Sequence, residues 1–384
     1  MVVKKKKIVI LGSTGSVGQS TLDLVRCHPD RFEIFGLVAG SKIDALITQI
    51  KEFKPHMVAL ATKVDAEKLV SQFQGDIEVL HGPEGASQIV THASVDFVMS
   101  AIVGAAGLLP TLAAAKAGKV IGLANKESMV VAGELVTKEA KKSGSFIIPV
   151  DSEHSALYQC LAGQRIEDVK NLILTASGGP FFKLPQEEFA SITVERALKH
   201  PNWDMGPKIT IDSATMMNKG LEVMEARWLF DVPVAKIKIC VHPQSIIHSM
   251  VEYKDGSVLA QLGVPDMRVP IAYALAYPER ITTGAKPLKL TDYRELNFFE
   301  PDFEKFKSLA IAYRVAERGE TYPAVLNAAN EVAVAAFLSH KIKFVDIPLL
   351  VEKTLDQHKS FVLSSLDDVL KADAWARKIT QENI

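Results

Sequence analysis

Cysteine is scarce in this chain: among 384 residues only Cys27, Cys160 and Cys240 occur, and no two of them are close in sequence. An odd number of widely spaced cysteines argues against a disulfide framework and against a zinc site built on thiolates. We therefore expect a cytoplasmic protein in which all three cysteines act as small, buried apolar residues.

Neither an excess of charge nor a long apolar run is present. The 44 Lys and Arg nearly balance the 45 Asp and Glu, so a general role on nucleic acid or on a membrane surface has no electrostatic support. The apolar run at 8–11, after four lysines, is too short for a signal peptide. Residues 97–115 carry no charge, but Gly104, Gly107 and Pro110 interrupt them, which favours a strand, a loop and a buried helix.

The length predicts two or three domains, and the first of them has a clear rhythm. Residues 1–150 alternate short apolar runs with helical segments such as 17–27, 43–53 and 127–142. This alternation predicts an α/β domain with a doubly wound, Rossmann-like, mostly parallel sheet covered on both faces. The predicted strands are 7–11, 33–39, 57–60, 78–80, 97–101, 120–122 and 146–149.

After residue 150 the rhythm changes. Strand-like runs at 171–176, 236–241 and 257–262, joined by longer loops, predict a central α/β domain over 151–276. Residues 277–302, rich in Pro, Thr, Gly and Lys, are typical of a linker. A small helical C-terminal domain is predicted for 303–384, with helices at 307–318, 322–339, 347–357 and 365–380.

A glycine-rich turn, GSTGSVG, joins the first predicted strand to the first predicted helix. Gly12, Gly15 and Gly18 permit a tight turn and let the backbone approach a pyrophosphate, which the helix N-terminus then faces. The position of the turn favours a dinucleotide site over the alternative, a tight turn in a domain that binds nothing.

The end of the second predicted strand indicates which dinucleotide is bound. NAD-specific domains usually place an acidic residue there for the ribose 2′-hydroxyl. Here the chain reads Val38-Ala-Gly40-Ser41-Lys42, and Asp44 lies within the following predicted helix. A serine and a lysine suit a 2′-phosphate, so we expect NADP.

Carboxylates gather in two segments. Asp151 and Glu153 follow the predicted strand 146–149, and Glu222 lies in the segment 211–222. Three carboxylates without a cysteine suit Mg²⁺ or Mn²⁺ rather than structural zinc, and such an ion polarises the carbonyl of a hydroxy-ketone. The alternatives are an exposed Asp-x-Glu turn and a surface Lys219–Glu222 helix pair.

The segment 211–222 is predicted to open a helix. Asp212 or Ser213 would then cap it, and Asn218 and Glu222 would share one face, with Lys219 beside them.

Three further segments carry polar groups. The turn 175–181 presents Ser177 and backbone N–H groups to a phosphate, and 122–127 ends a strand with Asn-Lys-Glu. Residues 200–207 contain two prolines, Pro201 and Pro207, together with His200 and Trp203. This composition suits a lid, here placed around 198–207. The alternative for the last segment is an ordinary loop anchored by a half-buried tryptophan.

Together these segments closely resemble the 1-deoxy-D-xylulose 5-phosphate reductoisomerases of the non-mevalonate isoprenoid pathway, over nearly the whole chain. The motifs that carry the resemblance are GSTGSVG at Gly12, LANKES at Leu123, DSEHSA at Asp151, ASGGPF at Ala176, HPNWDMG at His200, DSATMMNKGLEVMEARWLF at Asp212, HPQSIIHSMVE at His242 and GVPDMRVPI at Gly263.

The resemblance implies a role for each matching position. Asp151, Glu153 and Glu222 are implied as metal ligands, with Lys126 and Ser152 contacting substrate beside the ion, and Trp203 as the aromatic anchor of the lid. The implied catalytic residues are Lys126, Asp151, Glu153, Glu222 and His200. The implied pocket for the substrate phosphate comprises Ser177, Ser213, Asn218 and Lys219, with His200 closing over it.

The implied NADPH contacts are Thr14, Gly15, Ser16, Val17, Gly40, Ser41, Lys42, Asn125, Glu127 and Gly206. Some members of the family have Lys-Asn where this chain has Ser41-Lys42, so the positive charge is retained while the individual contacts to the 2′-phosphate differ.

The implied reaction has two stages. 1-Deoxy-D-xylulose 5-phosphate rearranges by retro-aldol cleavage and re-aldol addition, and NADPH reduces the product to 2-C-methyl-D-erythritol 4-phosphate. Mg²⁺ or Mn²⁺ is the expected ion, with Co²⁺ as a further candidate. The family also implies a homodimer and sensitivity to fosmidomycin.

Two other hypotheses belong to different classes. An NADP-dependent dehydrogenase that acts without rearrangement or metal would keep its activity in EDTA. A non-catalytic nucleotide-sensing module, in which the acidic site is structural, would bind NADPH without turning over any sugar phosphate.

Overall fold

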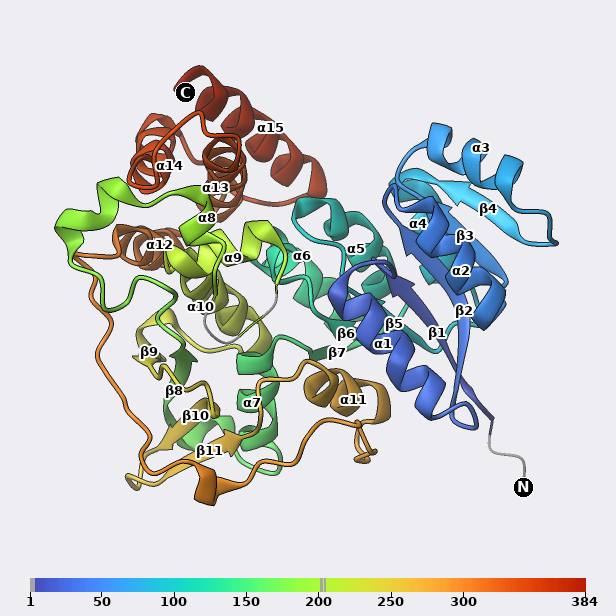
Figure 1. Cartoon of the computed structure of the whole chain (residues 1–384), viewed down its shortest axis with the longest axis horizontal. Helices are drawn as coiled ribbons and strands as arrows, with labels where there is room; N and C mark the ends of the chain where they lie inside the picture. The colour runs from blue at the N-terminus through green and yellow to red at the C-terminus, as the bar shows by residue number, and fades with distance from the viewer. Residues whose placement is uncertain (1–3, 201–202, 204) are drawn as a thin grey trace. The chain divides into compact units, whose positions relative to one another are not determined.

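The computed structural model describes residues 4–200, 203 and 205–384, and it divides into two compact units (Figure 1). Unit 1 comprises Met1–Ser128, Val136–Ser155 and Asp266–Ala285. Unit 2 comprises Met129–Leu135, Ala156–Pro265 and Lys286–Ile384. Each unit is built around its own sheet.

Unit 1 holds a seven-stranded parallel sheet in the order β4-β3-β2-β1-β5-β6-β7. The order reverses direction between β1 and β5, as in a doubly wound fold, and such a switch point is where open α/β sheets bind ligands. All seven predicted strands are present, and all except β4, which is only partly buried, contain apolar runs that are mostly buried. The strands are β1 (Lys6–Leu11), β2 (Phe32–Ala39), β3 (Met57–Leu60), β4 (Glu78–His81), β5 (Phe97–Ser100), β6 (Val120–Leu123) and β7 (Phe146–Pro149).

Helices connect these strands. The pair α1 and α11 pack together, as do α4 and α5. The uncharged run after β5 forms a short 3₁₀ turn and then α5, which confirms the prediction of a strand, a loop and a buried helix. Every helix among the described residues is too short or too polar to cross a bilayer. The helices are α1 (Ser16–Cys27), α2 (Ile43–Phe53), α3 (Lys63–Gln72), α4 (Gly82–Thr91), α5 (Leu108–Lys116), α11 (Arg268–Ala276) and α6 (Lys126–Ser143), of which Met129–Leu135 belong to unit 2.

Unit 2 holds a four-stranded sheet in the order β11-β10-β8-β9. Strand β8 (Val169–Ala176) runs parallel to β9 (Ile237–Val241), whereas β10 (Ile247–Tyr253) is antiparallel to both β8 and β11 (Val258–Leu262). Strand β10 is absent from the predicted set. Its buried residues include the polar His248 and Ser249, which weaken the apolar pattern.

The rest of unit 2 is mainly helical, and its four C-terminal helices match the predicted ones closely. Helix α13 packs against α14 and α15, and α12 packs against α10. A capping box at Ser365 and Asp368 fixes the start of α15. The helices are α7 (Ser152–Leu161), which begins in unit 1, α8 (Val194–Ala197), α9 (Pro207–Ala214), α10 (Met217–Phe230), α12 (Lys307–Arg318), α13 (Tyr322–Leu338), α14 (Asp346–Gln357) and α15 (Leu366–Glu382).

Candidate active site

The glycine turn lies directly after β1, at the switch point of the unit 1 sheet. Gly12 has φ +87°, and a Cβ there would lie 2.6 Å from the carbonyl oxygen of Ala101. A Cβ on Gly18 would lie 2.3 Å from the Gly12 carbonyl oxygen. Both positions therefore require glycine. Helix α1 begins at Ser16 with no side-chain cap on its first turn, so its N-terminal N–H groups face the loop as an anion site requires.

The predicted 2′-phosphate loop follows β2. Gly40, Ser41 and Lys42 are exposed, Lys42 is the N-cap residue of α2, and Asp44 lies inside that helix as expected. Because β1 and β2 are neighbouring parallel strands, both loops emerge at the same edge of the sheet.

The segment after β6 supplies three polar residues. Asn125 caps α6: its side chain accepts the Ser128 N–H at 3.0 Å, and its amide donates to the carbonyl oxygens of Ile102 at 2.5 Å and Gly104 at 3.0 Å. Glu127 accepts a longer bond of 3.3 Å from the same amide. The buried Asn125 thus fixes the loop from which Lys126 extends.

A lysine–carboxylate pair joins the ends of β6 and β7. The ammonium of Lys126 lies 2.5 Å from Asp151 Oδ2, and the two side chains are 6% and 15% exposed. The next residue, Ser152, donates its hydroxyl to Glu153 Oε2 at 2.5 Å. Two carboxylates and a lysine therefore share the edge of the sheet that carries the glycine turn. Oxygen donors of this kind suit a hard divalent cation.

In unit 2, Glu222 is fully buried on α10. Its carboxylate accepts hydrogen bonds from Asn218 Nδ2 at 2.6 Å and from Lys219 Nζ at 2.5 Å. The predicted i, i+4 and i, i+3 faces are confirmed. A buried carboxylate needs such compensating donors or a cation.

The predicted cap on this segment was wrong. Asp212 and Ser213 lie in α9, and α10 starts only after Met216, which adopts a left-handed φ of 62° and makes no capping bond. The motif therefore spans the end of one helix and the start of the next.

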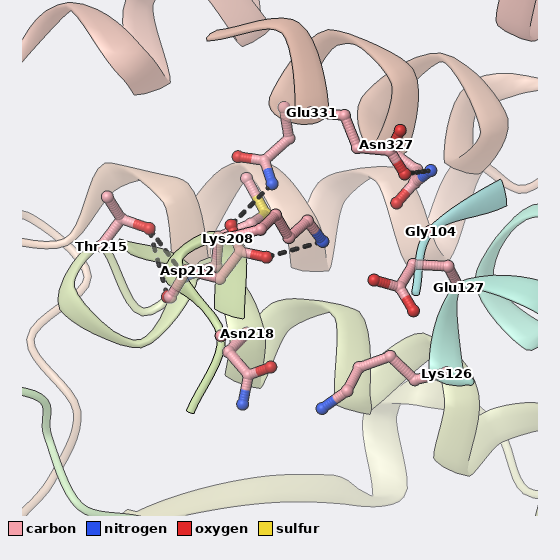
Figure 2. Close-up of polar contacts among 12 residues, drawn as sticks. Gly104, Lys126, Glu127, Lys208, Asp212, Thr215, Asn218, Asn327 and Glu331 are labelled. Atoms are coloured by element: carbon pink, nitrogen blue, oxygen red, sulfur yellow. Dashed lines mark hydrogen bonds and ion pairs between the residues drawn. The ribbon is translucent and has the colours of Figure 1, made fainter. Parts of the chain in front are cut away.

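Asp212 has a structural environment that local sequence does not reveal. Its carboxylate lies 2.7 Å from Lys208 Nζ and accepts the Asn330 amide of α13 at 2.8 Å. Figure 2 shows Lys208 and Asp212 facing one another, with Thr215 on the same turn. Sequence reasoning missed Lys208 and Asn330 here. The i, i+4 spacing of Lys208 and Asp212 is a usable signal, whereas no local pattern points to Asn330.

Ser177 and His200 meet in unit 2. Ser177 follows β8, and its Oγ lies 3.1 Å from His200 Nε2. The Trp203 N–H donates to His200 Nδ1 at 3.0 Å, so a neutral His200 carries its proton on Nε2 and donates it to Ser177. Trp203 packs against His248, with ring centroids 6.4 Å apart. Within the predicted lid, Pro201, Asn202 and Asp204 lie outside the described residues.

A glycine turn at the switch point of a parallel sheet, with a lysine and carboxylates at the same edge, defines the class of dinucleotide-dependent enzymes with a Rossmann-like domain. Three family models match the chain. One is described as 1-deoxy-D-xylulose 5-phosphate reductoisomerase, at residues 8–133, and the two C-terminal domain models of that enzyme match 147–230 and 262–379.

Curated relatives of the same description match over almost their whole length. The chain is 57% identical to the 1-deoxy-D-xylulose 5-phosphate reductoisomerase of Geotalea uraniireducens, with 98% of each chain covered. Identity to the enzyme of Chlorobaculum tepidum is 56%, covering 99% of this chain and all of the relative.

Solved structures agree. A crystal structure of DOX-P reductoisomerase in complex with NADPH, fosmidomycin and magnesium is 45% identical, with a TM-score of 0.93 and 98% of each chain covered. The Zymomonas mobilis enzyme in complex with NADPH is 44% identical, with a TM-score of 0.93 and 99% of each chain covered. The chain belongs to the 1-deoxy-D-xylulose 5-phosphate reductoisomerase family.

Proposed function

We propose that this chain converts 1-deoxy-D-xylulose 5-phosphate to 2-C-methyl-D-erythritol 4-phosphate in isoprenoid biosynthesis, by rearrangement and NADPH-dependent reduction with Mg²⁺ or Mn²⁺. The observation that carries the proposal is the Lys126–Asp151 pair, 2.5 Å apart, at the sheet edge that also holds the glycine turn of a chain from this family. This edge combines a reductant site with groups that suit a chelated hydroxy-ketone.

Asp151, Glu153 and Glu222 are the proposed metal ligands. When bound, the ion polarises the substrate carbonyl and its neighbouring hydroxyl. The donor set fits, because it consists of carboxylate oxygens and contains no thiolate. Lys126 and Lys219 each contact a carboxylate of this set and compensate its charge. Lys126 and Ser152 also orient the substrate oxygens.

The substrate phosphate is proposed to bind Ser177, Ser213, Asn218 and Lys219, with His200 and Trp203 covering it. The support is that Ser177 already engages His200, and that Asn218 and Lys219 lie on one turn of α10. Binding energy from this remote phosphate can hold the lid over the reacting carbons and exclude water.

The cofactor is proposed to lie along the glycine turn, through Thr14, Gly15, Ser16 and Val17. Its 2′-phosphate would contact Gly40, Ser41 and Lys42, and further contacts would come from Asn125, Glu127 and Gly206. Support comes from the first-turn N–H groups of α1 and from the exposed cation of Lys42 at the same sheet edge.

We also propose that the protein is a homodimer and that it is located in the cytoplasm. Strand β11 is an edge strand of the unit 2 sheet, and Val258, Leu259 and Leu262 on it are 49%, 42% and 37% exposed. An exposed apolar edge strand of this kind can pair with the same strand of a second copy. All three cysteines are free, which suits a reducing compartment.

The direct test is oxidation of NADPH, followed by absorbance, with 1-deoxy-D-xylulose 5-phosphate as substrate. We expect turnover with Mn²⁺, loss of turnover in EDTA, and recovery when Mn²⁺ is restored. Turnover that persists in EDTA would instead support the metal-free dehydrogenase, and NADPH binding without turnover would support the sensing module.

A further inference from the structure

A cavity of about 180 Å³ lies within unit 2, between the α9–α10 turn and the starts of α12 and α14. We call it the phenylalanine pocket, because Phe189, Phe306 and Phe344 line it together with Leu349. The Phe189 ring lies 5.7 Å from Phe306 and 5.8 Å from Phe344, centroid to centroid, so the apolar wall is continuous. A cavity of this size accommodates one aromatic ring, since about 150 Å³ is enough for benzene.

The charge of the pocket has one sign. Lys305 and Lys307 line it, and none of its lining residues, all of which the structure describes, is acidic. Lys305 donates to the Phe182 carbonyl oxygen at 2.6 Å and lies 5.6 Å from the centroid of the Phe189 ring. Lys307 is exposed at the rim and forms no ion pair within the described part of the chain. A cationic rim on an apolar wall is complementary to an anion with an apolar tail.

Ser308 supplies an independent observation. Ser308 lines the pocket and is only 1% exposed, and its hydroxyl is not engaged by any of the side-chain hydrogen bonds found among the described residues. A hydroxyl at the wall of a largely apolar pocket can donate a hydrogen bond to a ligand oxygen. Ser308 also lies in the first turn of α12, which has no acidic residue and no side-chain cap, so its N–H groups favour the same anion.

We propose that the phenylalanine pocket is a second binding site, for a small organic phosphate monoester whose apolar part is about the size of one aromatic ring. The apolar part packs against Phe189, Phe306 and Phe344. The phosphate takes the hydroxyl of Ser308 and the charge of Lys307. This site is separate from the proposed catalytic phosphate pocket, and it does not depend on the reaction assigned to the enzyme.

The pocket is also connected to the start of α10 through Thr215. Thr215 lines it, donates to the Asp212 carbonyl oxygen at 3.2 Å and accepts the Met217 N–H at 3.3 Å. Asn218 and Lys219 follow on the next turn of α10. A ligand in the pocket would therefore contact Thr215, and through its hydrogen bonds it would influence the position of Lys219.

Calorimetric titration of the full chain with benzyl phosphate tests the site. We expect saturable binding, and at least tenfold weaker binding of inorganic phosphate and of benzyl alcohol, because each offers only half of the recognised chemistry. Lys307→Glu should weaken benzyl phosphate binding at least fivefold. Lys353→Glu, an exposed lysine on α14 outside the pocket, is the matched control and should bind as wild type does.

A Lys219→Ala variant separates the two phosphate sites. Binding that survives Lys219→Ala and weakens in Lys307→Glu supports the proposal. Binding that is lost in Lys219→Ala and kept in Lys307→Glu would overturn it, because the probe would then occupy the catalytic pocket. Equal binding of inorganic phosphate and benzyl phosphate would overturn it as well.

Kinetics test the coupling through Thr215. Saturating benzyl phosphate should change the KM for the sugar phosphate at least twofold in wild type and leave it unchanged in Lys307→Glu. The same change of KM in both proteins would contradict the coupling and indicate competition at the catalytic site.

Discussion

At the scale of single residues, the unit 2 part of the proposed site depends on one buried carboxylate. Glu222 is fully buried and accepts hydrogen bonds from Asn218 and Lys219. These bonds hold both donors close to the carboxylate on α10, and we propose that the three residues together serve ion binding and phosphate binding. A change at Glu222 is therefore expected to affect the chemistry more than cofactor binding, for which most of the proposed contacts lie in unit 1.

Glu222→Gln should lower kcat by two or more orders of magnitude while NADPH still binds. The amide keeps the shape and accepts at one atom, but it removes the negative charge that a divalent ion requires. Steady-state kinetics and NADPH fluorescence titration measure the two effects. Glu317→Gln, an exposed position on α12, is the control. Near-normal turnover would remove Glu222 from the metal site.

The positions of individual side chains could be predicted from the sequence where they depend on local spacing. The shared face of Asn218, Lys219 and Glu222 follows from helical spacing, and Ser177 follows a recognisable strand and glycine turn. The hydrogen bond between Asp212 and Asn330 joins residues 118 positions apart, and no periodicity encodes it.

At the scale of elements, the Asp212 carboxylate links α9 to α13 through its hydrogen bond with Asn330. Its carboxylate is 1% exposed and is held by Lys208 and Asn330. Removal of the carboxylate takes one bond from the partly buried ammonium of Lys208 and one from the buried amide of Asn330.

Asp212→Ala should lower the free energy of unfolding by about 3 kcal/mol, since Lys208 and Asn330 both lose their bond to this buried carboxylate. Urea denaturation followed by circular dichroism measures the loss. Asp356→Ala, an exposed change on α14, should alter the free energy by less than about 0.5 kcal/mol. A loss below about 1 kcal/mol for Asp212→Ala would show that the pair contributes little.

The C-terminal helices also contain a group that responds to pH. Burial lowers the pKa of His358 below its ordinary value, and Glu320 opposes the shift. His358 Nε2 lies 2.8 Å from Thr321 Oγ1, and the ring packs 4.9 Å from Trp375. The folded state therefore favours the neutral imidazole. Its contribution to stability is present above about pH 6.5, the unfolded value, and is lost as the pH falls toward the lowered folded value.

His358→Gln should flatten the acid side of the stability profile. We expect the Tm to fall less between pH 7 and pH 5.5 (about the range of the histidine titration) in this variant than in wild type. His81→Gln, at an exposed histidine, should leave the profile unchanged. Identical slopes for wild type and His358→Gln would refute a role for His358.

The helices and strands that could be predicted from the sequence are those whose apolar residues form a continuous pattern. Apart from β4, the parallel strands of unit 1 contain largely apolar runs, and all seven were predicted. Strand β10 carries buried polar groups, and α11 contains Pro270 near its start, so neither has a clear local pattern. The assignment of Asp266–Ala285 to unit 1 depends on packing against distant sequence, which local patterns do not specify.

At the scale of the whole molecule, the exposed edge of β11 carries the proposal of a homodimer. Leu259→Lys places a charge on that edge, where a second copy would have to bury it. We expect this variant to elute as a monomer in size-exclusion chromatography with light scattering, while wild type elutes as a dimer. Val64→Lys, on exposed α3 in unit 1, is the control. A monomeric wild type would contradict the proposed homodimer.

The central claim is that one chain both rearranges a carbon skeleton and reduces it. Analysis of the product by NMR, together with the NADPH consumed in the presence of Mn²⁺, tests this most directly. We expect one NADPH to be oxidised for each branched 2-C-methyl-D-erythritol 4-phosphate formed. NADPH oxidation that yields an unbranched product would contradict the proposed function, because the carboxylates proposed to bind the metal would then have no rearrangement to support.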